Sequence, residues 1–230
     1  MSSITEILLG AILSILITIL IEYLRKPKMT MELIPPTWVD YAQLMEPRPA
    51  RLAVFLRARL KNKPLPKLFR WLSRNAALQA HANITFYHLD GQPVFGSAMA
   101  GRWSGTPEPA PPLYLRDSVI TVDGILTFNI NSQIESTRRD IYPGEQEDLD
   151  IVARFDDEPE CYGWNDQSYA SRPPWRNPAW QLPRGRFLVK VEILSAGDRK
   201  VDLYRICNDV DLTSFRLEPA LKGDVQKILS

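Results

Sequence analysis

The sequence predicts a mainly β protein in which one N-terminal transmembrane helix precedes an antiparallel β-sandwich with one or two short helices. Two observations lead to this prediction. First, residues 7–21 form an uncharged run in which eleven of fifteen positions are Ile or Leu. Second, the rest of the 230-residue chain shows short segments of alternating hydrophobicity between turn signals, with nineteen prolines and eleven glycines. Such a pattern is typical of strand-rich domains.

Residues 4–24 contain the predicted transmembrane helix. At about 1.5 Å per residue such a helix is about 31 Å long, which matches a hydrocarbon core of about 30 Å. Glu6 and Glu22 lie near its ends, where a carboxylate reaches the headgroups. Two alternatives stay open, although the segment has neither pattern. A cleaved signal peptide would begin with a basic region, and a buried helix of a soluble domain would carry a polar face.

The flanks of the helix indicate its orientation. Arg25, Lys26 and Lys28 follow the helix, and no basic residue precedes it. Because basic flanks stay on the cytoplasmic side, we expect a single-pass protein of the inner (cell) membrane with its C-terminal part in the cytoplasm. Residues 1–28 are then an anchor with a basic flank. Residues 29–230 form a cytoplasmic β-sandwich domain that is large enough for its own core.

Gly10, Ser14 and Thr18 recur at every fourth position of the predicted helix and so lie in one row. Rows of small residues let two helix backbones approach closely in a bilayer. The pattern is compatible with chance, and it also predicts self-association of the helix into a homo-oligomer.

Alternating hydrophobicity predicts the strands of the domain, which lie at residues 29–34, 51–60, 78–87 and 149–155 and in a β-hairpin at residues 186–194 and 200–208. The strand at 51–60 has a mostly basic outer face that also carries Phe55. In the strand at 78–87, Leu78 and the following even positions face the core. Helical spacing predicts a short helix over 67–77, with Leu68 and Phe69 toward the core, and a last helix within 219–229. Roughly eight to ten strands with closely spaced turns indicate an immunoglobulin-like or fibronectin-like antiparallel sandwich.

No catalytic or cofactor-binding motif is present in the sequence. It lacks G-x-x-x-x-G-K-S/T, H-E-x-x-H, G-x-S-x-G and G-x-G-x-x-G. His81 and His88 lie on opposite faces of one predicted strand. Cys161 and Cys207 lack the spacing of a zinc site, and we expect them to be small buried hydrophobes. We therefore expect no enzyme activity, no cofactor and no metal.

Basic residues gather between positions 48 and 89, which hold nine Arg or Lys and no acid, whereas residues 140–160 hold nine acids and one Arg. We expect a docking surface formed by Arg57, Arg59, Lys61, Lys63, Lys67, Arg70 and Arg74. In a membrane-tethered protein, each such cation near anionic phospholipid contributes about 1 kcal/mol. Nucleic acid is a second target, which we expect less than lipid, although phosphate contacts need only cations. The alternative is a charged exterior that the acidic segment neutralises.

A second candidate surface is the aromatic and arginine-rich part of residues 156–185. Exposed aromatic residues beside Arg are typical of interface anchors, so we expect a protein partner to contact Trp164, Trp175, Arg176 and Trp180. The alternative is that tryptophans on a long connection cap the open end of the sandwich.

Four phrases of the sequence resemble a family of uncharacterised prokaryotic proteins with an N-terminal membrane helix and a strand-rich soluble domain. They are LKNKPLP at residues 60–66, RNAA at 74–77, RWS at 102–104 and GRFLVKV at 185–191. The layout also resembles the membrane effectors that accompany Argonaute and other prokaryotic defence systems. That resemblance implies a cytoplasmic domain that engages anionic lipid or the sensor protein, and a helix that damages the membrane when triggered. It assigns no role to any single residue.

We therefore expect a membrane-anchored binding or effector protein whose cytoplasmic β-sandwich engages a protein partner or anionic phospholipid. As an antiviral defence effector, it would cluster so that Gly10, Ser14 and Thr18 of several protomers meet and the bilayer leaks. The alternative is a non-toxic accessory or scaffold domain that makes protein contacts through its tryptophan-rich segment.

Overall fold

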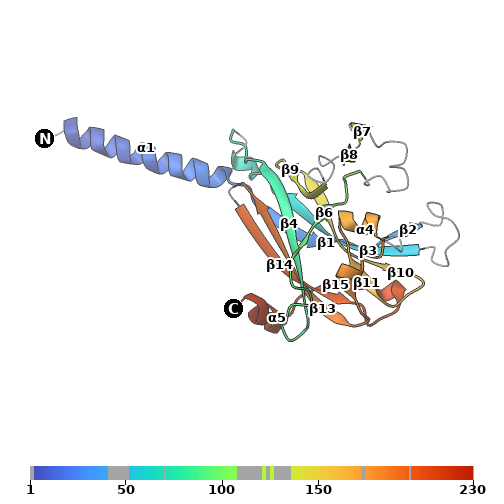
Figure 1. Cartoon of the computed structure of the whole chain (residues 1–230). Coiled ribbons are helices and arrows are strands. Elements are labelled where there is room, and N and C mark those ends of the chain that lie inside the picture. Colours follow the sequence, from blue (N-terminus) through green and yellow to red (C-terminus); the bar gives the residue numbers. More distant parts are fainter. Residues whose placement is uncertain are drawn as a thin grey trace.

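The computed structural model describes residues 3–40, 52–69, 71–107, 121–122, 125–126, 136–171, 175–196 and 198–229. The N-terminal helix α1 (Ser3–Arg25) projects from the rest of the chain as a single rod (Figure 1). The other described α-helices are α4 (Asp166–Ala170) and α5 (Lys222–Leu229). Short 3₁₀ turns form η1 (Lys67–Phe69), η2 (Pro178–Trp180) and η3 (Leu212–Ser214).

Two antiparallel sheets make up the body of the domain. The first sheet has the order β1-β3-β10-β11-β12, with β2 on β3 and β6 on β10. Its strands are β1 (Met29–Leu33), β2 (Thr37–Asp40), β3 (Leu52–Asn62), β6 (Arg102–Trp103), β10 (Gln146–Phe155), β11 (Cys161–Gly163) and β12 (Gln181–Leu182). The second sheet has the order β15-β14-β13-β4-β5, with β9 on β4. Its strands are β4 (Ala77–Tyr87), β5 (Met99–Ala100), β9 (Arg139–Ile141), β13 (Arg186–Ser195), β14 (Asp198–Cys207) and β15 (Arg216–Pro219). A separate described pair is β7 (Thr121–Val122) and β8 (Ile125–Leu126).

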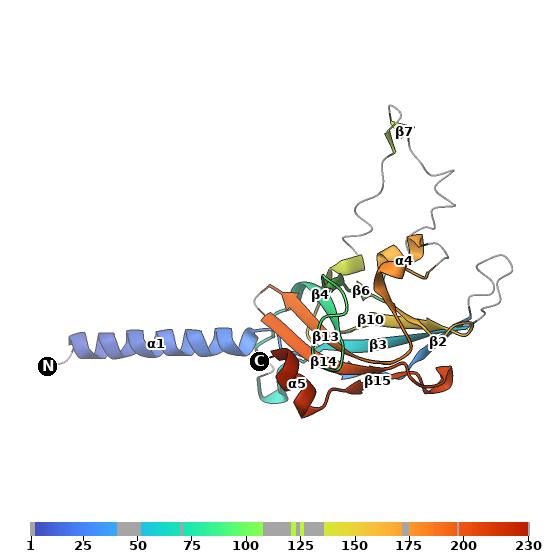
Figure 2. The same cartoon turned by 60° about the horizontal axis from the view of Figure 1, so that its bottom comes forward.

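The main hydrophobic core lies between the two sheets (Figure 2). Leu56 and Leu60 of β3 belong to the same buried cluster as Ile84 and Phe86 of β4. Each such side chain contributes about 1.5–3 kcal/mol when it leaves water. The mainly β class and the two-sheet arrangement are therefore confirmed, whereas the finer immunoglobulin-like architecture stays a prediction.

Gly101 lets the chain pass from one sheet to the other. It lies between β5 of the second sheet and β6 of the first. A Cβ atom at this position would lie 2.7 Å from the Cβ of Ala82 and 2.9 Å from Cδ1 of Leu149. Because only glycine has no atom there, any other residue would force the two sheets apart locally.

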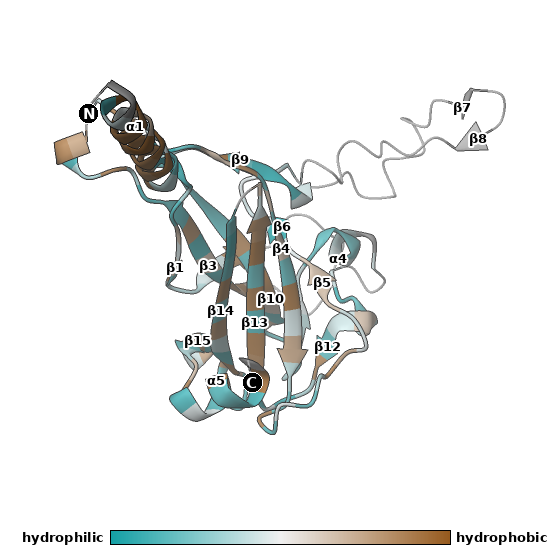
Figure 3. Cartoon of the chain, turned by 90° about the vertical axis from the view of Figure 1, so that its left-hand side faces the viewer, coloured by the Kyte–Doolittle hydropathy of each residue, from teal (hydrophilic) through white to brown (hydrophobic). Residues whose placement is uncertain are grey.

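Helix α1 is long and apolar enough to cross a membrane, as judged by its length and composition over Thr5–Arg25. None of this span is buried against the domain, and most residues of the helix itself are hydrophobic (Figure 3). The alternative of a buried core helix is therefore wrong. A signal sequence would pass the same test, so that alternative stays open.

Several predicted elements are confirmed, and one is not. β1, the β13–β14 hairpin and α5 form where the sequence predicts them. Residues 67–77 were expected to form an amphipathic helix, but only the 3₁₀ turn η1 forms in their described part. Leu68 is 82% exposed instead of packed against the core. The backbone N–H of Asn75 bonds to the carbonyl of Arg25 in α1, so the end of this segment takes part in a long-range contact in place of a local helical ladder.

β4 also corrects the predicted position of Leu78. Gln79 has a φ of 51°, and the pairing of β4 with β9 shifts register between Ala77 and Ala80. A bulge of this kind inserts a residue and reverses the alternation on one side of it. As a result Ala77 is buried and Leu78 is 45% exposed, while the predicted alternation holds from Ala80 onward.

The outer face of β3 differs from the basic face that the sequence predicts. Phe55 is buried there in a second hydrophobic cluster with Phe155, Trp164 and Trp175. The ring of Phe55 meets that of Trp164 edge to face, with 4.8 Å between their centroids. The first sheet is thus covered on part of both faces, because residues of the 156–185 segment fold back over it.

Candidate anion-binding pocket

The end of α1 is hydrogen-bonded to the junction loop, by which we mean residues 63–69 and 71–76 between β3 and β4. The backbone N–H of Asn75 donates to the carbonyl of Arg25 at 2.7 Å. Nη1 of Arg74 donates to the carbonyl of Lys26 at 2.5 Å. Because the last carbonyls of a helix have no partner within it, the junction loop caps α1. The helix is therefore fastened to the domain directly beside its last turn.

Asn62, the last residue of β3, holds this junction together. Its side chain is 1% exposed, and its Oδ1 accepts a hydrogen bond from the backbone N–H of Lys28 at 3.2 Å. Its Nδ2 donates to the carbonyls of Asn75 and Ile141, each at 3.0 Å. One amide thus joins the segment after α1, the junction loop and the end of β9.

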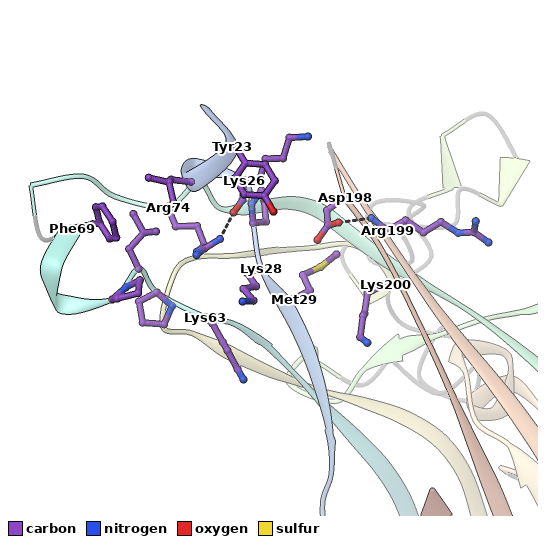
Figure 4. Close-up of a pocket in the computed structure, with 15 residues that line it drawn as sticks. Tyr23, Lys26, Lys28, Met29, Lys63, Phe69, Arg74, Asp198, Arg199 and Lys200 are labelled. Carbon is purple, nitrogen blue, oxygen red and sulfur yellow. Dashed lines mark hydrogen bonds between the residues drawn. The ribbon is translucent and has the colours of Figure 1, made fainter. Parts of the chain in front are cut away.

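A cavity of about 640 Å³ lies at this junction, and we call it the junction pocket. Its walls come from the end of α1, the segment that follows it, the junction loop and the start of β14 (Figure 4). Six lining residues are basic and one is acidic: Lys26, Lys28, Lys63, Arg74, Arg199, Lys200 and Asp198. Tyr23, Met29 and Phe69 contribute apolar surface. The pocket is therefore a cationic hollow with a partly apolar wall.

Not all of these cations are free to meet a ligand. Arg199 pairs with Glu192 at 2.5 Å, and Lys200 pairs with Asp202 at 3.0 Å. Lys26, Lys28 and Lys63, by contrast, form no ion pair with any described residue. These three ammonium groups leave a surplus of positive charge on the side of the pocket nearest α1.

Arg74 is the fourth cation without a carboxylate partner among the described residues. Its Nη1 is bound to the carbonyl of Lys26, but its buried Nε has no hydrogen-bond partner in the described part of the chain. Burial lowers the pKa of Arg74. A buried donor without an acceptor costs free energy, so Arg74 adds to the uncompensated positive charge beside the junction pocket.

The predicted basic series divides into two groups. Arg57 and Arg59 on β3 pair with Asp150 and Asp148 of β10, each at 2.6 Å, and Lys61 pairs with Glu32 of β1 at 2.7 Å. The acidic segment therefore neutralises Arg57 and Arg59, as the alternative interpretation held, and Glu32, which lies outside that segment, neutralises Lys61. Of the others, Lys63 and Arg74 line the junction pocket, Lys67 is exposed at the start of η1, and Arg70 lies outside the described residues.

The tryptophan-rich candidate surface is not an exposed one. Trp164, Trp175 and Trp180 are all buried, at 1%, 7% and 9% exposure. Arg176 is also buried; it pairs with Asp157 and Glu158, and its guanidinium lies 4.0 Å from the ring centroid of Phe155. The expectation that these four residues are exposed is therefore wrong. Trp164, Trp175 and Arg176 cover the outer face of the first sheet, whereas Trp180 belongs to the main core. Contact of a protein partner with them stays a prediction.

The small residues of α1 do form one row along the helix. Gly10 has open space where a Cβ would be, and the hydroxyl of Thr18 donates to the carbonyl of Ser14 at 2.9 Å. That hydroxyl proton is used within the helix, so close backbone packing, more than a hydrogen bond between helices, would drive association. Self-association through this row stays a prediction.

The described residues hold no group of three or more His, Cys, Asp or Glu side chains placed to bind a metal ion. Cys161 and Cys207 are buried, and burial raises the pKa of the Cys161 thiol. A thiol of this kind is a poor nucleophile because it stays protonated. Among the described cavities, the junction pocket is the one whose lining holds six basic residues and one acidic residue.

Sequence reasoning found only part of this pocket. It treated Lys26 and Lys28 as a flank that sets orientation, and it missed Arg199 and Lys200 on β14. The basic run after α1 was a usable signal for the first two. The tip of the β13–β14 hairpin is distant in sequence, so no local pattern connects it with α1.

The fold and the pocket together define a class of protein: one apolar N-terminal helix, capped by a loop of a two-sheet β domain, with a cationic pocket at the junction. The chain matches no protein-family model, no curated protein and no solved structure.

Proposed function

We propose that the chain is a single-pass protein of the inner (cell) membrane whose cytoplasmic domain binds an anionic phospholipid headgroup in the junction pocket. The observation that supports this most is the position of the unpaired cations. Lys26, Lys28, Lys63 and Arg74 lie at the end of the one described helix that is apolar enough to span a bilayer.

The size and charge of the pocket suit a headgroup. Ligand pockets commonly measure about 300–1,000 Å³, and the junction pocket has about 640 Å³. Each Lys or Arg near an anionic membrane surface contributes about 1 kcal/mol, so Lys26, Lys28 and Lys63 together contribute about 3 kcal/mol. The partly apolar wall formed by Tyr23, Met29 and Phe69 would contact the upper part of the lipid.

Lipid is preferred to a soluble anion because of where the pocket lies. If α1 spans the bilayer, its last turn ends at the headgroup region, and the pocket begins at Tyr23 of that turn and at Lys26 directly after it. Phosphates of the cytoplasmic leaflet are then present at high local concentration. A free phosphate ion would have to compete with them at every encounter.

A lipid-retention experiment tests the proposal. The full-length protein is placed in nanodiscs of phosphatidylcholine with or without phosphatidylglycerol, and bound lipid is counted by native mass spectrometry after release. The test variant is Lys28→Glu with Lys63→Glu. The control variant is Lys222→Glu with Arg184→Glu, which reverses two exposed cations that do not line the pocket.

We expect the wild-type protein and the control variant to retain phosphatidylglycerol in preference to phosphatidylcholine. The test variant should lose that preference by about tenfold or more, since two favourable contributions of about 1 kcal/mol each are removed and reversed. Equal retention by the test variant and the control would overturn the proposal.

The role as a defence effector, with an Argonaute or another sensor as partner, stays a prediction from resemblance. The alternative of a scaffold that binds proteins through the tryptophan-rich segment has less support, because Trp164, Trp175 and Trp180 are buried. Lipid binding through the junction pocket is compatible with an effector, since it would hold the domain close to the bilayer that α1 crosses.

A further inference from the structure

Two apolar side chains of the junction loop extend into solvent. Leu68 is 82% exposed and Trp71 is 72% exposed, more than any other large hydrophobic residue in the described part of the β domain. On α1, Leu9 is 70% and Ile7 is 67% exposed. The two loop side chains are thus as open as those of the free-standing helix, and apolar groups exposed together in this way mark interaction sites.

These side chains lie beside the end of α1. Figures 1 and 2 both show the teal turn η1 at the end of the domain from which α1 projects. The hydrogen bonds from Asn75 to Arg25 and from Arg74 to Lys26 hold the junction loop to that end. Phe69 of η1 and Tyr23 of α1 line the same pocket (Figure 4). The position of η1 relative to α1 is therefore set by the fold.

We infer that the η1 turn is a second membrane contact, in which Leu68 and Trp71 insert into the interfacial layer of the leaflet where α1 ends. This inference rests on the proposed membrane span of α1. Tryptophan favours that layer because its ring is apolar and its N–H is polar. Lys63, Lys67 and Arg74 flank the two side chains, as basic residues do in segments that lie on anionic membranes.

The second contact gives the domain a fixed orientation. A single helix allows the attached domain to rotate about the helix axis and to tilt. Insertion of Leu68 and Trp71 at a second point removes much of that freedom, and the junction pocket lies between the two contacts. The pocket would then open onto the headgroups of the same leaflet.

A site-specific fluorescent label tests the contact in the full-length protein. Leu68→Cys is labelled with an environment-sensitive fluorophore, because the native Cys161 and Cys207 are buried and stay unlabelled. The control carries the label at Leu221→Cys. The native side chain there is also exposed, at 57%, but it lies directly before α5 and outside the junction loop. Both proteins are reconstituted in neutral phosphatidylcholine vesicles that contain a lipid with a quencher in the upper part of its acyl chain.

We expect the quencher lipid to remove most of the fluorescence of the label at position 68 and little of that at position 221. A second variant, Trp71→Ser, should reduce the quenching at position 68, because it removes half of the inserted surface. Equal quenching at positions 68 and 221, or no effect of Trp71→Ser, would overturn the inference.

The outcome is separable from that of the proposed function. Neutral vesicles are used, so a pocket that shows no preference for phosphatidylglycerol leaves this result intact. A label at Leu16→Cys, within α1, reports the span itself. If the label at position 16 is quenched and that at position 68 is not, the span stands and the second contact fails; if neither is quenched, both fail.

Discussion

The side chain of Asn62 donates to the carbonyl of Asn75 at 3.0 Å and so joins the last residue of β3 to the loop that caps α1. The same amide also bonds Lys28 and Ile141. Three backbone groups from separate segments therefore depend on one buried side chain. In this way the junction between helix and sheets becomes part of the folded domain.

Replacing Asn62 with Ala should destabilise the protein by about 2–4 kcal/mol, because buried polar groups left without partners cost about 1–3 kcal/mol each. Chemical denaturation of the full-length protein in detergent, followed by tryptophan fluorescence, measures the change. Lys61→Ala is the neighbouring control, since it breaks only the half-exposed pair with Glu32. Similar midpoints for the two variants would contradict the role given to Asn62.

Asp150 and Asp148 offer a matched comparison of buried and exposed ion pairs on β10. Asp150 is 2% exposed and contacts Arg57 at 2.6 Å and the buried Arg102 at 3.6 Å. Asp150→Ala leaves Arg57 without its carboxylate and removes one of the two carboxylates beside the buried Arg102, which also pairs with Asp166 at 2.9 Å, and it should cost about 3–5 kcal/mol. Asp148→Ala breaks the more exposed pair with Arg59 and should cost about 0–1 kcal/mol. Urea unfolding of both variants measures the two losses of unfolding free energy. Equal losses would contradict the expected difference between the buried pair and the more exposed pair.

Asp224 should make stability depend on acid pH. Hydrogen bonds from Arg205 lower the pKa of its carboxyl below the ordinary value of 3.8. Since the pKa is lower in the folded state, the ionised carboxylate stabilises the fold above 3.8, and this contribution disappears as the pH falls through the folded-state pKa. The free energy of unfolding, measured from about pH 5 to about pH 2, should therefore fall less steeply for Asp224→Asn than for the wild type.

A suitable control for Asp224 is Glu218. The hydrogen bond from Arg216 also lowers the pKa of Glu218, but both partners of this pair are more than one-third exposed. Water and salt screen such a pair, so Glu218→Gln should change the acid limb of the pH profile less. An Asp224→Asn profile that parallels the wild type would show that this carboxylate contributes no linked stability.

Lipid binding by the junction pocket should weaken with salt. The Debye length falls from about 10 Å at 0.1 M to about 3 Å at 1 M ionic strength, which screens Lys26, Lys28 and Lys63 from headgroup phosphates. Retention of phosphatidylglycerol, measured at both ionic strengths, should therefore decline for the wild type. Depth quenching of the label at position 68 should change little, because insertion of Leu68 and Trp71 is apolar. A parallel decline of both signals would argue that they report one electrostatic contact.

The row of small residues predicts a further effect within the bilayer. Gly10→Leu should reduce energy transfer between labelled copies of the full-length protein in vesicles, because it fills the groove in which two backbones would meet. Leu16→Phe adds bulk away from the row and serves as the control. If the wild type itself shows no more energy transfer than unassociated protein does, the homo-oligomer prediction is wrong.

Much of the strand pattern could be predicted, because period-two alternation directly reports a half-buried strand. Ile84 and Phe86 face the core as their positions indicate. The alternation failed at Leu78, since the positive φ of Gln79 is a backbone feature that residue hydrophobicity does not report. It failed again at Phe55, because the outer face of β3 is covered by a segment from elsewhere in the chain.

The candidate site was less predictable, for a reason that concerns charge more than shape. A basic residue that forms an ion pair with a carboxylate of the same protein has little charge left to attract an anionic ligand. Arg57 meets Asp150 across 93 positions of sequence, so its neutralisation is decided by the pairing of β3 with β10. Lys63 has no such partner among the described residues, although the sequence around both is similarly basic.

By itself, the sequence determined the apolar helix, the mainly β class and the segregation of charge, because hydrophobic periodicity and composition are local properties of the chain. Only the tertiary structure decided which cations are paired, that Trp164, Trp175 and Trp180 are buried, and that the junction loop caps α1 with Leu68 and Trp71 exposed beside it. Those outcomes depend on contacts between residues far apart in sequence, and such contacts form only when the two sheets bring these residues together.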